Sequence, residues 1–242
     1  TMPLYCRRAD HIIAVSEATR RDLIVAYDLP PEKITVIHEA AAPHFRPQPA
    51  DAVARVRATF GLPERYLLYV GTIEPRKNLE RLLDAWTELY QAGECPPLVI
   101  GGKRGWLSDG FFAALEACPA RDGVILTGYV PDADLPALYT GATAFVWPSL
   151  YEGFGLPPLE AMACGTPVVC SNASSMPEVV GDAAVLFDPT DRDALMGALR
   201  RGLADGDALR DKGLARAATF SWARTARETE GVYARVKGIH IP

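Results

Sequence analysis

The sequence YLLYV at 66–70, followed by GTIEPRKN at 71–78 and LERLLDAWTELYQ at 79–91, decides the fold class. The first segment is apolar without strict alternation, which is typical of a strand buried on both faces of a parallel sheet. The third segment is a helical stretch. Between them, Gly71 permits a tight turn and Pro75 suits a helix start, so we predict a strand, a loop and a helix in succession.

The same alternation of strand and helix continues along the chain to residue 204. We predict buried strands at Tyr66–Val70, Leu98–Ile100, Val124–Thr127, Ala144–Trp147, Pro167–Cys170 and Ala184–Phe187. We predict helices at Leu79–Gln91, Gly110–Ala117, Leu135–Thr140, Pro158–Ala163 and Asp191–Ala204. The fold class is therefore α/β, with a doubly wound, Rossmann-like parallel sheet covered on both faces. Ligands bind such sheets at the carboxyl ends of the strands, so the site is expected in the strand-to-helix loops.

The amino-terminal segment is predicted to be the end of another α/β domain whose beginning is absent. A strand at Ile12–Val15 leads into a helix capped by Ser16, with Glu17 in the first turn, where the helix dipole favours negative charge. A second short strand follows at Ile34–Ile37. Residues 38–50 contain three prolines and little periodicity, so they are interpreted as a linker.

The composition excludes several classes of protein. The 242 residues are 49% hydrophobic and 23% charged, the balance of a globular protein with one to two domains. A net charge of -5 argues against a nucleic-acid partner, and no apolar run approaches the ~18–20 residues that span a bilayer. Residues 1–20 lack the apolar core of a signal peptide. The cysteines have no metal-binding spacing and are expected to be reduced, mostly buried thiols of a cytosolic protein: Cys6, Cys95, Cys118, Cys164 and Cys170.

The loop at 71–78 is a candidate anion site. Arg76 and Lys77 lie at the start of the following helix, where a guanidinium fork and an ammonium beside free backbone N–H groups would bind phosphate. Asn78 is a candidate helix cap. Cations at a helix N-terminus oppose the dipole, a local cost that an anionic ligand would offset. The alternative is a pair of solvated surface charges, and this loop alone does not decide between the two.

The segment PSLYEGFGLPPLEAMA at 148–163 carries the strongest functional pattern. Gly153 and Gly155 let the main chain approach a ligand closely, and the two prolines that follow preset a helix start. Glu160 lies in an otherwise apolar helix and needs a partner, such as a ribose diol, whereas Glu152 is placed to meet a sugar hydroxyl. The alternatives are a salt-bridged core acid at 160 and a solvent-facing acid at 152. The two glycines, together with the Arg-Lys loop, favour a ligand.

Three weaker patterns do not decide a function. Asp132 and Asp134 fit an acidic metal-holding pattern, but they precede a helical segment, and a helix cap is the favoured interpretation. The loop GGKRG at 101–105 is equally suited to phosphate contact and to solvent. The histidines are scattered without metal spacing: His11, His38, His44 and His240. No metal site is predicted.

Five motifs spread over nearly the whole chain resemble those of one enzyme family. They are GTIEPRKN at 71–78, the Glu152-(seven residues)-Glu160 pattern, GTPVV at 165–169, PEVVGDAA at 177–184 and the segment 9–16. Together they resemble glycosyltransferase family 4, the retaining enzymes of GT-B fold, and within it the bacterial group 1 enzymes that transfer mannose or a related hexose. One motif departs from the family, because Thr72 stands where many relatives carry an arginine.

The resemblance implies a two-domain architecture. Residues 1–45 would be the last strands and helices of the amino-terminal domain with its linker, and 46–221 the complete nucleotide-sugar-binding domain. Residues 222–242 would be the terminal helix that crosses back to the first domain. In the family, the amino-terminal domain supplies the acceptor site and a catalytically important histidine. Because most of it is expected to be missing, this chain alone is expected to bind a donor without transferring sugar.

The resemblance also assigns roles to residues of this sequence. Lys77 and Arg76 would bind the donor diphosphate, Glu160 the ribose, and Glu152 the hydroxyls of the donor sugar. The catalytic set is thus Lys77, Arg76 and Glu152. The main chain around Tyr129 and Val130 would contact the base, and the backbone amides of the second loop would line sugar and phosphate. The full donor-binding set is Gly71, Thr72, Tyr129, Val130, Gly153, Phe154, Gly155, Leu156 and Glu160.

The implied function is transfer of a hexose, with mannose favoured, from a nucleoside diphosphate sugar to an acceptor hydroxyl with retention of configuration. GDP-mannose is the favoured donor, no cofactor or metal is expected, and the acceptor is a glycan or glycolipid in polysaccharide assembly. The implied location is cytoplasmic, with peripheral contact at the inner face of the membrane through the absent domain. Two alternatives remain open: a nucleotide-sugar-binding module without transfer activity and, more distantly, an epimerase or phosphorylase of the same architecture.

Overall fold

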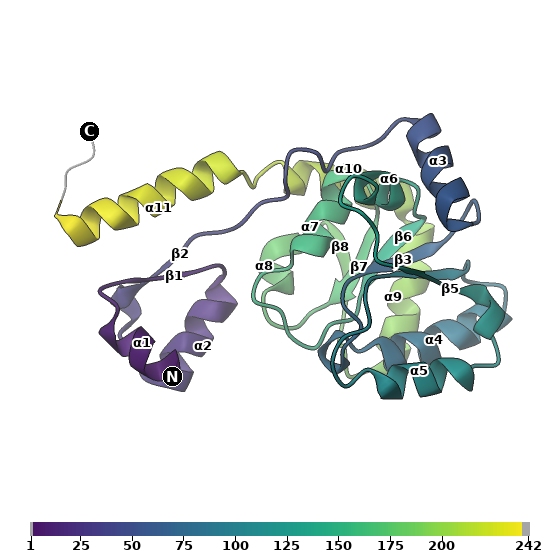
Figure 1. The fold of residues 1–242 in the computed structure, drawn as a ribbon, viewed down its shortest axis with the longest axis horizontal. Coiled ribbons are helices and arrows are strands. Elements are labelled where there is room, and N and C mark those ends of the chain that lie inside the picture. Colours follow the sequence, from purple (N-terminus) through teal and green to yellow (C-terminus); the bar gives the residue numbers. More distant parts are fainter. Residues whose placement is uncertain (1, 239–242) are drawn as a thin grey trace.

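The computed structural model describes residues 2–238, so residues 1 and 239–242, which include His240, lie outside it. The described chain contains two parallel sheets, one of six strands and one of two (Figure 1). The large sheet has the order β5-β4-β3-β6-β7-β8. Its strands are β3 (Leu67–Val70), β4 (Leu98–Gly101), β5 (Val124–Gly128), β6 (Ala144–Trp147), β7 (Val168–Ser171) and β8 (Ala184–Phe187).

The strand order places a switch point in the middle of the large sheet. From β3 the chain moves outward through β4 to β5, and it then returns to the other side of β3 with β6 before moving outward again. Leu67 and Leu68 of β3 pair with Ala144 and Phe145 of β6 in parallel register. The loops that follow β3 and β6 therefore leave the same edge of the sheet side by side, where open α/β sheets bind ligands.

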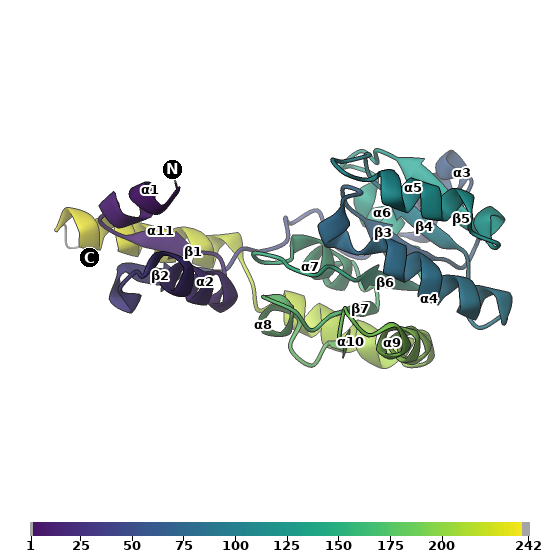
Figure 2. The same ribbon diagram turned by 90° about the horizontal axis from the view of Figure 1, so that it is seen from below.

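Helices cover both faces of this sheet. Contacts join α4 (Leu79–Gln91) to α5 (Asp109–Glu116) and α9 (Arg192–Ala204) on one face. On the other face, α7 (Leu156–Ala163) contacts α6 (Leu135–Thr140), α8 (Met176–Val180) and α10 (Gly206–Ala217), and α3 (Ala50–Phe60) packs on α6. Figures 1 and 2 show the two layers with the sheet between them.

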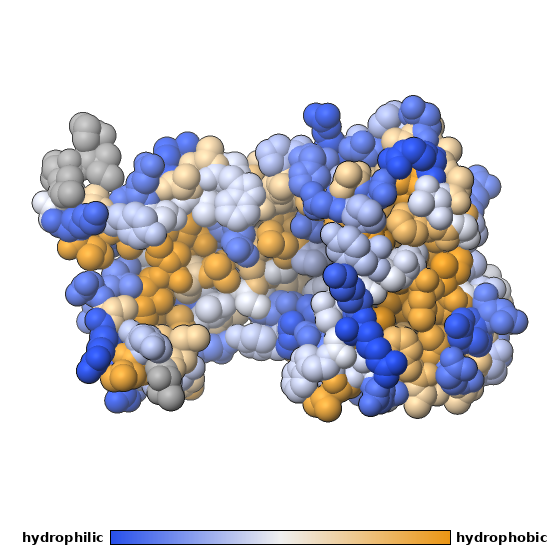
Figure 3. Space-filling model, in the orientation of Figure 1, coloured by the Kyte–Doolittle hydropathy of each residue, from blue (hydrophilic) through white to orange (hydrophobic). Residues whose placement is uncertain are grey.

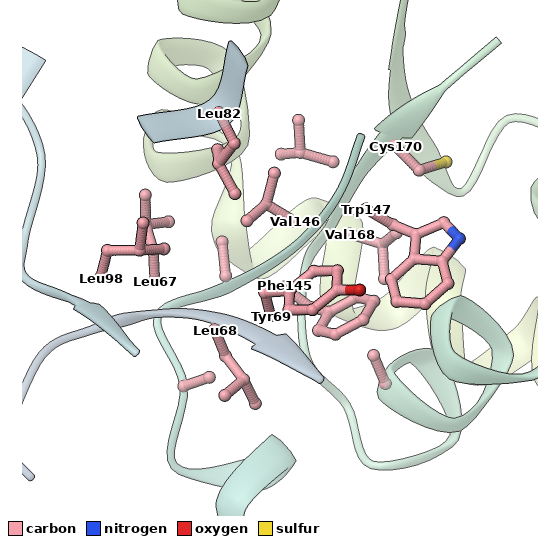
Figure 4. Close-up of a cluster of buried hydrophobic side chains, with 14 of the residues drawn as sticks. Leu67, Leu68, Tyr69, Leu82, Leu98, Phe145, Val146, Trp147, Val168 and Cys170 are labelled. Atoms are coloured by element: carbon pink, nitrogen blue, oxygen red, sulfur yellow. The ribbon is translucent and has the colours of Figure 1, made fainter. Parts of the chain in front are cut away.

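The core of the large sheet is buried on both sides, as its apolar strands require. Leu67, Leu68 and Tyr69 of β3 have no exposed surface, and neither do Phe145 and Val146 of β6. Figure 4 shows these side chains gathered with Trp147 around the two strands. Continuous burial explains why the strands lack the alternation of a half-exposed sheet.

The amino-terminal part forms a separate small layer with the last helix. It comprises α1 (Met2–Arg8), β1 (Ile12–Ala14), α2 (Glu17–Tyr27), the 3-10 turn η1 (Pro31–Lys33) and β2 (Ile34–Val36), with β1 and β2 paired in parallel. The helix α11 (Trp222–Lys237) lies along this part, away from the six-stranded sheet, in both ribbon views. In Figure 3 the surface is hollowed between the two parts.

The predicted elements are confirmed in kind and differ mainly at their ends. All six predicted strands of the large sheet form, and the predicted helices begin or end within two residues of the observed ones. The Ser16 cap is confirmed, because its hydroxyl accepts from the Thr19 N–H at 3.0 Å. The five cysteines are free and buried, as expected. The helices that were not predicted are α3, α8 and α10.

The prediction that the Asn78 side chain caps α4 is wrong. Asn78 precedes the helix but adopts a left-handed backbone conformation, with φ 58°, and its side chain accepts no capping bond. Its Nδ2 instead donates to the carbonyls of Pro148 (3.1 Å) and Pro189 (2.9 Å), so this amide links three loops at one edge of the sheet.

Candidate functional site

The loops after β3 and β6 are joined directly at the switch point. The 3-10 turn η2 (Pro75–Lys77) fills the first loop, and the carbonyl of Arg76 accepts from the Leu150 N–H at 2.9 Å. The Asn78 amide bridges the same two loops through Pro148. The cations of the first loop and the acid of the second are thereby brought to one place.

Glu152 forms the centre of a charged cluster. Its carboxylate lies 2.6 Å from Lys77 Nζ and 2.9 Å from Arg76 Nη1, and Glu74 holds the other end of the guanidinium at 2.7 Å. The Ser149 hydroxyl donates to the Glu152 carboxylate at 2.6 Å. Side-chain exposure is 9% for Lys77 and 12% for Glu152. Neither a solvated cation at 77 nor a solvent-facing acid at 152 fits this geometry.

Lys77 is held over an aromatic face. Its Nζ lies 4.2 Å from the centroid of the Trp147 ring, and Trp147 in turn stacks on Tyr69 at 5.2 Å. Burial lowers the pKa of the Lys77 ammonium, while the ion pair with Glu152 opposes that shift. Gly71 lies against the same rings, and a Cβ there would come within 2.8 Å of the Tyr69 hydroxyl. Only glycine at position 71 leaves the stacked rings of Trp147 and Tyr69 undisturbed.

The second loop presents unpaired backbone donors. Within residues 2–238, the amides of Gly153, Phe154 and Gly155 donate to no other group of the protein. They immediately precede α7, which begins at the half-buried Leu156 and continues with two prolines that have no N–H. Gly155 has a φ of 120°, and a Cβ at this position would collide with the Met176 side chain. Free N–H groups at a helix start form a site for an anion or a ring of hydroxyls.

Glu160 occupies a different environment from Glu152. Tyr139 Oη donates to one carboxylate oxygen at 3.1 Å, and no cation of the described chain forms an ion pair with this acid. Burial raises the pKa of Glu160 to about 7, the charge of Asp132 also raises it, and the Tyr139 hydrogen bond acts in the opposite direction. The salt-bridged core acid considered as an alternative is therefore not observed. The second carboxylate oxygen makes no hydrogen bond to the protein described here.

Glu160 and Lys77 are connected through a row of packed side chains. Lys77 lies over Trp147, whose ring is 5.9 Å from that of Phe145. Phe145 packs on Tyr139 at 5.4 Å, and Tyr139 bonds Glu160. The row links the two groups through pairwise contacts that run from the loop after β3, across β6, to α7. The roles assigned to them remain predictions.

The loops after β4 and β5 flank the same edge. The Gly71 N–H donates to the Gly101 carbonyl at 2.8 Å, and Gly102 N–H donates to Gly128 O at 2.7 Å. Gly102 has a φ of 143°, and a Cβ there would overlap the Gly71 carbonyl. Gly102 is therefore required by the close packing of two loops, which the sequence pattern did not reveal.

The candidate base-contacting segment is partly exposed. Tyr129 is 63% exposed, whereas Val130 is buried. Lys103 Nζ lies 4.6 Å from the centroid of the Tyr129 ring, which places a further cation near this segment. Thr72 is exposed, and its carbonyl accepts from the Tyr69 hydroxyl at 3.2 Å.

The remaining candidate residues serve other contacts. Asp134 precedes α6 but makes no capping bond and pairs with Arg55 at 2.9 Å, so the cap interpretation is wrong for its side chain. Asp132 lies 3.0 Å from His44. No group of three or more His, Cys, Asp or Glu residues within 2–238 is arranged to hold a metal ion. No helix in this range is long and apolar enough to cross a membrane.

Comparison with known proteins identifies the family. The profile described as "Glycosyl transferases group 1" matches residues 53–218, and the one described as "Glycosyltransferase Family 4" matches residues 2–45. The chain belongs to the group 1 glycosyltransferases, and its six-stranded parallel sheet is a domain of the GT-B fold.

The curated relatives include bacterial mannosyltransferases. The chain is 41% identical over 228 residues to "O-antigen chain mannosyltransferase B" of Escherichia coli, covering 92% of this chain and 60% of that protein. It is 35% identical over 227 residues to "Serotype-specific mannosyltransferase WbdA" of Escherichia coli, covering 90% of this chain and 28% of the relative. The chain thus spans less than two thirds of each of these relatives.

Solved structures agree on the fold. Sucrose-phosphate synthase from Thermosynechococcus elongatus superposes with a TM-score of 0.85 at 27% identity, over 98% of this chain and 61% of that one. Anabaena HepE in complex with UDP and glucose superposes with a TM-score of 0.84 at 19% identity, over 96% of this chain and 64% of that one. The latter likeness concerns architecture alone.

Proposed function

We propose that the protein transfers a hexose from a nucleoside diphosphate sugar to an acceptor hydroxyl, with retention of configuration. One observation carries the proposal: the Lys77–Arg76–Glu152 cluster joins the loops after β3 and β6 at the sheet's switch point, and the second of these loops also presents three backbone amides without a partner within residues 2–238. Cations and fixed N–H groups at one point suit a diphosphate, and the acid suits sugar hydroxyls.

The mechanism depends on charge that develops on the leaving diphosphate as the C1–O bond breaks. Groups already fixed where that charge grows stabilise the transition state more than the ground state. An ammonium has three N–H donors, and Glu152 occupies one of those of Lys77, so Lys77 can bridge Glu152 and a phosphate oxygen. Glu152, from the loop after β6, would then both orient the Lys77 ammonium and contact the sugar.

The donor sugar, base and acceptor are parts of the proposal. The names of the relatives as O-antigen and serotype-specific mannosyltransferases support mannose and a glycan or glycolipid acceptor. We propose GDP-mannose as the donor, without a cofactor or metal, with Lys77 and Arg76 acting on the diphosphate. The proposed location is cytoplasmic, at the inner face of the membrane.

A calorimetric titration tests the proposal. We expect one GDP to bind per chain, more tightly than UDP or ADP, and GDP-mannose to compete for the same site. A parallel assay follows mannose transfer and release of GDP from GDP-mannose. Binding without transfer would favour the binding-module alternative, and turnover without release of GDP would favour an epimerase. A chain that binds none of the three diphosphates would refute the proposal.

A further inference from the structure

The helix α2 contacts the main chain of the 152–155 loop directly. Ser16 Oγ lies 2.6 Å from the Gly153 carbonyl oxygen, and Thr19 Oγ1 lies 3.0 Å from the same atom. Both hydroxyls donate to one acceptor across 134 or more residues of sequence. The motif at 9–16 and the loop at 152–155 therefore meet at a single carbonyl.

The geometry of a peptide bond transmits this contact to the neighbouring amide. The carbonyl of Gly153 and the N–H of Phe154 belong to one planar trans peptide group, so they point in opposite directions. Fixing the carbonyl toward α2 consequently fixes the Phe154 N–H away from α2. That N–H is one of the three in this loop that have no partner within residues 2–238.

The other side of the loop is held by serines that follow β7. Ser174 Oγ accepts from the Glu152 N–H at 2.8 Å, and Ser175 Oγ lies 2.5 Å from the Phe154 carbonyl. These contacts arise within the large-sheet part of the molecule. The hydroxyls of Ser16 and Thr19, which come from the amino-terminal part, fix the Gly153–Phe154 peptide group.

The contact with α2 is itself reinforced. The Glu178 carboxylate accepts from the Glu17 N–H, with both oxygens at 2.9 Å, which anchors the first turn of α2 to α8. Tyr151 Oη donates to Asp22 at 2.5 Å, so the residue before Glu152 is also joined to α2. The position of α2 against the loop is thus set by several bonds, and the two hydroxyls join α2 to the Gly153 carbonyl, whose peptide group carries the free Phe154 N–H.

We propose that Ser16 and Thr19 are positioning residues for the donor: they hold the Gly153–Phe154 peptide so that its N–H faces the sugar and β-phosphate. The inference rests on the proposed function. It makes recognition of the sugar end of the donor depend on the amino-terminal part, while the ribose end depends on Glu160 in α7. The two ends of one ligand are therefore sensitive to different substitutions.

Thr19→Val is the variant of choice. It removes one hydroxyl at nearly constant volume, whereas Ser16→Ala would also remove the cap of α2, because Ser16 Oγ accepts from the Thr19 N–H. Thr59→Val is the matched control, since Thr59 lies in α3, and its hydroxyl donates to the Arg55 carbonyl within the same exposed helix. Equal melting temperatures of the three proteins would show that folding is unchanged.

The experiment titrates wild type, Thr19→Val and Thr59→Val with GDP-mannose and with GMP, which lacks the sugar and the β-phosphate. We expect Thr19→Val to raise the Kd for GDP-mannose about 3- to 10-fold, the effect of one hydrogen bond, and to leave the Kd for GMP unchanged. Thr59→Val should match wild type with both ligands.

Two failures are distinguishable. Suppose that wild type binds GDP-mannose and that Thr19→Val binds it equally tightly, or that the substitution raises the Kd for GMP and the Kd for GDP-mannose by the same factor. In either case the positioning role is wrong and the proposed function stands. If wild type binds neither ligand, the proposed function is wrong, and the inference falls with it.

Discussion

In an enzyme that carries both GT-B domains, Lys77→Ala is expected to lower kcat for sugar transfer by about 30- to 1000-fold, the range found when one preformed charged contact to a transition state is removed. Lys77 is nearly buried, fixed over Trp147 and paired with Glu152, so no reorganisation is needed as charge grows on the leaving diphosphate. A contact that strengthens in the transition state changes kcat more than substrate affinity. The measurement is the initial rate at saturating GDP-mannose.

The control for Lys77→Ala is Lys212→Ala. Lys212 is an exposed lysine that pairs with Asp182 on the surface at 3.0 Å, so its loss should leave the rate unchanged. In the Lys77 variant, Glu152 retains Arg76 and the Ser149 hydroxyl, which limits the cost to folding, and a thermal melt checks this. A folded Lys77→Ala protein with a near-normal rate at saturating donor would exclude the catalytic role.

The strands could be predicted because their environment leaves a direct trace in the sequence. Strands buried on both faces must be apolar at every position, and runs such as AFVW at 144–147 show this without ambiguity. The sequence of helix α10 gives a much weaker signal of its secondary structure. In the described structure only Leu209 and Gly213 of its residues are buried, so its sequence GDALRDKGLARA has little amphipathic pattern to detect.

The helix α3 was missed for a different reason. It begins at Ala50, the last residue of the segment interpreted as a linker, and no element was predicted between that segment and the strand that begins at Tyr66. Its buried residues are Val53 and Val56, which pack a short face against α6. What holds it in place is a tertiary contact, which the local sequence does not encode.

The candidate site also has a part that the sequence could predict and a part that it could not. The loops after all strands of a parallel sheet leave the same edge, so the sequence could place Lys77 and Glu152 at one edge, whereas the adjacency of β3 and β6 was seen only in the structure. Their mutual ion pair could not be predicted either, because it depends on side-chain distances across two loops. For the same reason, the sequence could not predict the hydrogen bond between Tyr139 and Glu160 or the one between Thr19 and Gly153.

Glu160→Gln is expected to weaken GDP binding by about 10- to 100-fold at pH 8, the effect of losing charge-assisted hydrogen bonds from the ribose hydroxyls. A ribose contact is largely the same in the ground state and the transition state, so kcat at saturating donor should change little. Calorimetry at pH 8 measures the first effect, and initial rates measure the second.

The pH dependence of binding follows from the raised pKa of Glu160. With that pKa at about 7, the side chain is mostly ionised at pH 8 and mostly protonated at pH 6. A protonated carboxyl accepts the two ribose hydrogen bonds poorly, so wild-type affinity should fall about 5- to 10-fold between these pH values. The phosphate of GDP titrates in the same range, and the Glu160→Gln protein, which shares that titration, isolates the contribution of Glu160.

The same substitution should stabilise the unliganded protein, which separates a binding role from a structural one. Because burial raises the pKa of Glu160 above its unfolded value, the folded protein holds the proton more tightly, and stability is lost as pH rises from about 4.5 to about 7. Glu160→Gln removes that penalty, so its free energy of unfolding should exceed the wild-type value by about 1–3 kcal/mol at pH 8, with little difference at pH 4.5. A structural acid would give the opposite result, a less stable protein that binds GDP as before. Lower affinity together with higher stability is expected only if the buried charge is maintained for a ligand.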